Sequence, residues 1–105
     1  MEIVELREDS SGFVMARDCH LDSKKKDTVK WKNDTDTDYI IHFDKCPFRE
    51  NHFTVFAHSE KGPIELDPKV LARTRVYPKT YAYEIRRPDA NSGSVMAADP
   101  NVIVH

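Results

Sequence analysis

Short runs in which apolar and polar residues alternate constrain the fold of this chain more than any other feature. In Thr28–Lys32, the apolar residues Val29 and Trp31 alternate with two lysines. The same period recurs in Tyr39–Phe43, whose apolar side consists of Tyr39, Ile41 and Phe43. Side chains of a β-strand point alternately to its two faces, so each run predicts a strand with one buried and one exposed face.

Similar runs occur along most of the chain, separated by Pro, Gly, Asn and Asp, which favour turns. They lie at residues 2–7, 12–16, 18–22, 53–57, 81–86 and 102–104. In the first of them we expect Val4 and Leu6 to point inward. The sequence therefore predicts a single all-β domain over residues 1–105, a sandwich of about seven strands.

Two more local predictions follow from turn and helix signals. Residues 33–38 are dense in turn formers, so we expect strands 28–32 and 39–43 to pair as a hairpin. Residues 68–73 contain better helix formers, with Asp67 as a candidate N-cap and Pro68 at the first helical position. This stretch is expected to form one short helical turn.

The charge balance argues against some classes of partner. The chain has 16 basic and 18 acidic residues and a net charge of −2, which favours neither nucleic acid nor an anionic membrane. The basic clusters Lys24–Lys26 and Arg86–Arg87 fit solvated turns better than an anion contact. No apolar run is long enough to cross a bilayer, as expected of a soluble protein, and the given sequence does not open with a basic-then-apolar pattern. The chain is expected to be cytoplasmic, or periplasmic or secreted if a leader has been removed.

Two motifs give the chain a resemblance to a known family. Asp27–Asn33 is similar to the Gly-Asp-Thr-Val-x-Trp-x-Asn run of cupredoxins, with Lys26 in place of the glycine. Val76–Tyr83 is similar to their Val-x-Pro-Gly-x-Tyr-x-Tyr run, with Lys79 in place of the glycine. The resemblance implies a Greek-key β-sandwich of the plastocyanin and azurin type.

The positions at which cupredoxins bind copper carry other residues here. By alignment, Tyr39 and Pro88 replace the two histidines and Ile85 replaces the cysteine, so that Met96 alone matches a ligand position, that of the axial ligand. Type 1 copper requires two imidazoles and a thiolate, and a thioether alone binds copper weakly. The resemblance therefore implies a cupredoxin-like domain without type 1 copper, and we expect no cofactor.

A metal-binding or redox function remains open as an alternative, because four potential ligands for copper or zinc lie close together in the sequence. They are His42, Cys46, His52 and His58. Three or four nitrogen and sulfur donors can hold zinc in a tetrahedral array. Their spacing matches no compact ligand motif, so exposed sheet and loop positions are the simpler interpretation.

The two cysteines, Cys19 and Cys46, bear on redox state and on catalysis. In a reducing compartment both would remain free thiols, and in an oxidising one they could form a disulfide. A nucleophilic cysteine needs a low pKa and a positioned base, and Cys46 has only His42 and His52 near it in sequence. We therefore expect no enzyme activity and no catalytic residue.

The surface that a sandwich offers to partners lies in its end loops. Residues 45–52 include Phe48 and Arg49, and Phe48 together with Phe56 would make an exposed apolar patch suited to a protein partner. Alternatively, Phe48 closes the end of the core. The sequence thus predicts a non-catalytic binding module with a protein partner of unknown identity, and no nucleic acid or membrane.

Overall fold

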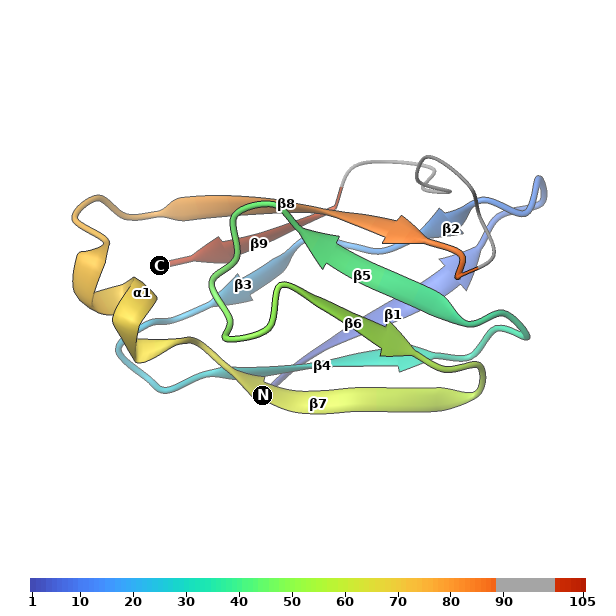
Figure 1. The fold of residues 1–105 in the computed structure, drawn as a ribbon, viewed down its shortest axis with the longest axis horizontal. Helices are drawn as coiled ribbons and strands as arrows, with labels where there is room; N and C mark the ends of the chain where they lie inside the picture. The colour runs from blue at the N-terminus through green and yellow to red at the C-terminus, as the bar shows by residue number, and fades with distance from the viewer. Residues whose placement is uncertain (89–99) are drawn as a thin grey trace.

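The computed structural model describes residues 1–88 and 100–105, which form nine strands and one helix (Figure 1). The strands make two sheets. This confirms a mainly β structure with two curled sheets, and the described part has more strands than the predicted seven.

The first sheet has four strands: β1 (Glu2–Glu8), β2 (Val14–Met15), β4 (Thr28–Asn33) and β7 (Ser59–Glu65). Their order is β2-β1-β4-β7. β1 runs parallel to β4, and the other two pairs are antiparallel. β2 and β7 are therefore the edge strands of this sheet.

The second sheet has five strands: β3 (Cys19–Leu21), β5 (Tyr39–Phe43), β6 (His52–Val55), β8 (Lys79–Arg86) and β9 (Asn101–Val104). Their order is β3-β9-β8-β5-β6. β3 runs parallel to β9, and the remaining pairs are antiparallel. The C-terminal strand β9 thus lies inside the sheet, between β3 and β8.

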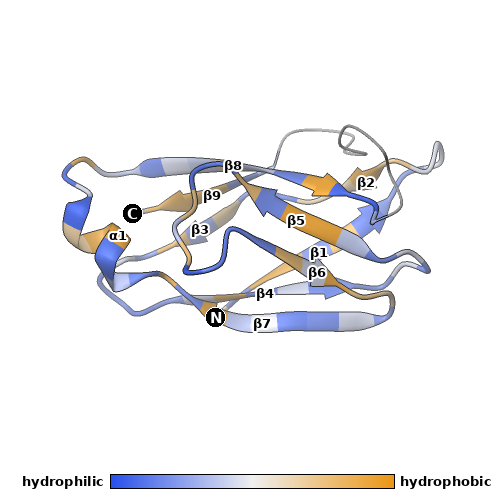
Figure 2. Ribbon diagram, in the orientation of Figure 1, coloured by the Kyte–Doolittle hydropathy of each residue, from blue (hydrophilic) through white to orange (hydrophobic). Residues whose placement is uncertain are grey.

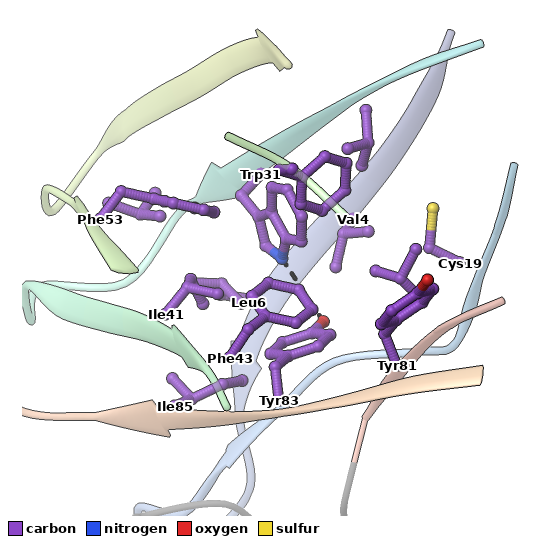
Figure 3. Packing of buried hydrophobic residues seen from close by; sticks show 14 of the residues in the cluster. Val4, Leu6, Cys19, Trp31, Ile41, Phe43, Phe53, Tyr81, Tyr83 and Ile85 are labelled. Atoms are coloured by element: carbon purple, nitrogen blue, oxygen red, sulfur yellow. Dashed lines mark hydrogen bonds between the residues drawn. The ribbon is translucent and has the colours of Figure 1, made fainter. Parts of the chain in front are cut away.

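Hydrophobic residues occur on strands of both sheets (Figure 2). The buried apolar side chains among them form one cluster between the two sheets (Figure 3). Every inward position predicted from alternation in β1, β4 and β5 is buried. Trp31 is fully buried at the centre, with edge-on ring contacts to Phe43, Phe48, Phe53 and Tyr83 at centroid distances of 5.1–6.4 Å. Aromatic rings prefer such arrangements because the positive edge of one ring meets the negative face of another.

The predicted hairpin of strands 28–32 and 39–43 is wrong. β4 pairs with β1 and β7 in one sheet, whereas β5 pairs with β6 and β8 in the other. The turn between them carries the chain across the sandwich instead of reversing it within a sheet. Asn33 anchors this turn, since its side-chain amide donates to the carbonyls of Thr37 and Val55.

Strand β7 has no counterpart among the predicted strands. Its sequence, SEKGPIE, contains charged residues, a glycine and a proline, all of which are depleted in strands. Gly62 allows the close pairing with β4, because a Cβ at this position would lie 2.7 Å from the carbonyl oxygen of Val29. The strand forms through long-range pairing rather than through its own propensity.

The predicted helical turn is confirmed as α1 (Pro68–Arg73). Asp67 caps its N-terminus, where the carboxylate accepts a hydrogen bond from the Lys69 N–H at 3.0 Å, and Pro68 opens the helix. At the other end, the Thr74 N–H donates to the carbonyls of Val70 and Leu71. The helix is thus fixed at both ends, close to the start of β8 (Figure 1).

Candidate functional site

The four residues predicted as alternative metal ligands have separate local partners. His42 and His52 are cross-strand neighbours on β5 and β6, and His42 also contacts Asp44 through Nε2 and Oδ1 at 3.2 Å. His58 pairs with Asp36, while the Cys46 thiol donates to the Glu50 carbonyl. Within residues 1–88 and 100–105, no group of three or more His, Cys, Asp or Glu side chains is arranged to hold a metal ion. The predicted four-ligand cluster is therefore not assembled in this part of the chain.

Two residues at the positions aligned with copper ligands lie in the core. Tyr39 and Ile85 are both fully buried, and Ile85 faces Ile41 across the β5–β8 pair. The Tyr39 hydroxyl donates to Glu8 Oε1 at 2.7 Å, and burial raises the pKa of this hydroxyl. Pro88 is exposed, and Met96 lies outside the described residues.

Both cysteines are free thiols. Burial raises the pKa of Cys19 to about 12, and it also raises the pKa of Cys46. The thiolate is the nucleophilic form of cysteine, and burial disfavours this form at both side chains. The backbone N–H of Phe48 donates to the Cys46 sulfur at 3.3 Å, which holds this thiol inside the loop.

The predicted interaction residues do not form one patch. Phe48 is only 3% exposed and packs edge-on against Trp31 and Phe43, so it closes the core, as the alternative interpretation held. Phe56 is 61% exposed in the turn after β6. The prediction that Phe48 and Phe56 form one exposed surface is therefore wrong, because hydrophobic burial draws Phe48 inward from its loop.

Arg49 lines a hollow of about 560 Å³ beside β6 and β7, together with Phe53. The charged side chains around it are of both signs: Arg49, Glu50, Glu60, Lys61 and Glu65. One of them, Glu60, already pairs with Lys30 at 3.3 Å. This hollow has no marked preference for a cation or an anion.

A more distinctive cleft, of about 700 Å³, lies at the α1 end of the sandwich, and we call it the basic cleft. Its walls come from the β5–β6 loop, from α1, from the α1–β8 loop and from the start of β8 (Figure 1). The lining residues are Lys45, Cys46, Val70, Arg73, Thr74, Arg75, Val76, Pro78, Lys79 and Tyr81. Four of these ten carry positive charge and none is acidic.

Hydrogen bonds and core contacts fix the walls of the basic cleft. The Asp67 N–H donates to the Pro47 carbonyl at 2.8 Å, which ties the β5–β6 loop to the N-terminus of α1. Val70 and Cys46 pack against the hydrophobic core, and Tyr81 is buried within it. The Thr74 hydroxyl donates to the Val70 carbonyl at 2.8 Å and is therefore engaged in closing the helix.

The four cationic side chains of the basic cleft are available to a ligand. Lys45, Arg73, Arg75 and Lys79 are all exposed. None of them takes part in the ion pairs found among the described residues. Their gathering around one cleft is notable in a chain whose net charge is −2, because it concentrates positive potential where an anion can enter.

The sequence interpretation missed these cations, although a local signal was present. Between Asp67 and Glu84 the chain has four basic residues and no acidic one: Lys69, Arg73, Arg75 and Lys79. Because they are spread over 11 positions, they do not form a visible run like Lys24–Lys26. Lys45 joins them only through the fold.

The chain matches no protein-family model, no curated protein and no solved structure. In the part of the chain that the structure describes, no helix has the length and apolar character required to cross a membrane.

Proposed function

We propose that this protein is a non-catalytic binding module that takes up an anionic partner in the basic cleft. The observation that carries the proposal is the set of four exposed cations around one cleft, with no acidic residue among its lining. Arginine binds carboxylate and phosphate groups through two parallel hydrogen bonds, and lysine adds a mobile point charge. An anion bound here would relieve the mutual repulsion of these side chains.

We further propose that the sandwich is of the cupredoxin type, with Greek-key connections. The two motifs support this assignment, since Val29, Trp31, Tyr81 and Tyr83 are all buried on strands. The non-catalytic assignment is supported by the raised pKa values of Cys19 and Cys46.

A titration with inorganic pyrophosphate, followed by two-dimensional NMR of the backbone amides, tests the binding proposal. We expect shifts at residues 45 and 73–79, with an affinity that falls as salt is added. The double variant Arg75→Ala/Lys79→Ala should bind about tenfold more weakly, because two charged contacts are lost.

The matched control is Lys24→Ala/Lys25→Ala, which removes the same charge from an exposed turn. It should bind pyrophosphate like the unmodified protein. Equal weakening in both double variants would mean that net charge alone attracts the anion, and the proposal would fail. Shifts centred on another part of the chain would contradict it equally.

A further inference from the structure

We infer that the natural occupant of the basic cleft is a short acidic peptide segment of a partner protein, with an aromatic or long aliphatic side chain between its carboxylates. This inference rests on the proposed function, and it specifies the chemistry of the anionic partner.

The first argument is the apolar part of the cleft. Val70, Val76, Pro78 and Tyr81 lie among the four cations. Val76 is 75% exposed, and the next residue, Tyr77, is 38% exposed. A small inorganic anion would leave these surfaces in water, whereas an apolar side chain flanked by carboxylates would cover them while the cations are neutralised.

The second argument is the arrangement of the charges. The cations come from the β5–β6 loop, α1, the α1–β8 loop and β8, so four different segments bring them to one open hollow. A peptide chain that lies in such a hollow can present its carboxylates to several of these segments at once. The volume of about 700 Å³ lies within the usual range of ligand clefts, which suits a few side chains better than an extended surface.

The third argument favours a peptide over a membrane surface or a nucleic acid. With 18 acidic against 16 basic residues and a net charge of −2, the chain as a whole has no general attraction for an anionic bilayer or a phosphate backbone. A short segment that reaches only into the cleft needs no more than the four cations that line it. Charge complementarity therefore selects a narrow acidic segment.

The test compares two capped, fluorescently labelled peptides, Glu-Glu-Phe-Glu-Glu and Glu-Glu-Ser-Glu-Glu, by fluorescence anisotropy. We expect the phenylalanine peptide to bind about tenfold more tightly, because its ring becomes buried. The variant Val76→Ser should remove most of this difference without weakening the serine peptide. The control Ile3→Ser changes another exposed apolar residue, on β1 and outside the cleft lining, and should leave both affinities unchanged.

Failure of this inference can be separated from failure of the proposed function. Equal affinities for the two peptides, together with pyrophosphate binding at the basic cleft, would overturn the peptide assignment alone. The protein could instead bind phosphatidylserine vesicles more tightly than the phenylalanine peptide, and lose this binding in Val76→Ser. That result would identify a lipid surface as the occupant and would also overturn the peptide assignment. If neither peptide nor pyrophosphate binds at the cleft, both proposals fail.

Discussion

At the scale of single residues, Cys19 illustrates how burial changes the chemistry of a side chain. It is 4% exposed and lies in the same cross-strand row as Val102 and Tyr81. Figure 3 shows it near Tyr81 in the core. Desolvation by the core is the largest cause of its raised pKa, with smaller contributions from Glu2 and Asp27. The Cys19 side chain therefore packs in the core, where burial favours the neutral form of its thiol.

This burial predicts a loss of stability in alkali. The unfolded thiol titrates near pH 9.0 and the folded one near pH 12, so the contribution of Cys19 is complete below pH 9.0 and is lost as the pH rises through 12. Halfway through this interval, the loss in the free energy of unfolding should be about 2 kcal/mol. Urea denaturation of the protein and of Cys19→Val at increasing pH measures it.

The variant Cys19→Val has no thiol to ionise and should lose less stability over the same pH range. Tyr39 and Tyr83 also have pKa values raised by burial, but they are present in both proteins and cancel in the difference. Parallel pH profiles for the two proteins would show that the Cys19 thiol does not control this loss.

At the scale of elements, Asn33 decides how β4 leads into the second sheet. It is a fully buried polar residue at the end of β4. Its amide nitrogen donates to the carbonyls of Thr37 and Val55 at 2.8 and 3.0 Å, and its oxygen accepts from the N–H and hydroxyl of Thr35. One side chain thus joins β4, the turn after it and β6.

Replacement of this amide should destabilise the connection between the sheets. We expect Asn33→Ala to lower the free energy of unfolding by about 3 kcal/mol, because the buried Val55 carbonyl and the part-buried backbone groups of Thr35 and Thr37 lose their hydrogen-bond partner. Thermal and urea denaturation followed by circular dichroism measure the effect. The exposed Asn51→Ala is the matched control and should change stability little. A loss equal to that of Asn51→Ala would contradict the assigned role.

At the scale of the whole molecule, Trp31 joins the two sheets and the β5–β6 loop. It lies on β4 and contacts Phe43 on β5, Phe53 on β6, Tyr83 on β8 and Phe48 in the loop. Its indole N–H also lies 3.4 Å from the Tyr83 hydroxyl oxygen, as Figure 3 shows. Because the basic cleft is built on the same loop and on β8, its geometry depends on this central packing.

Removal of the indole should therefore weaken the entire fold. We expect Trp31→Ala to lower the free energy of unfolding by about 4 kcal/mol, which is a large part of the roughly 5–15 kcal/mol typical of a domain. Urea denaturation followed by circular dichroism gives the value. Ile3→Ala, at a position that is 55% exposed, should cost far less. A similar cost for both variants would refute the central role of Trp31.

The fold was predictable where the alternation of apolar and polar residues within a strand shows which of its faces is buried. Alternation in β1, β4 and β5 predicted the buried residues, and the Asp67 and Pro68 signals predicted α1. Strand β7 was missed because pairing with β4, not local propensity, makes it a strand. The basic cleft was missed because Lys45 and the cations of residues 73–79 are far apart in the sequence.

The sequence by itself determined which face of most strands is buried and where the short helix begins. It also determined that positive charge accumulates between Asp67 and Glu84. These are local properties, because side-chain periodicity and capping depend only on near neighbours. The tertiary structure alone decided that β4 and β5 belong to different sheets, that Phe48 is buried and that four cations surround one cleft. Those outcomes depend on which distant segments pair, since the free energy of burial is gained only when the two sheets come together.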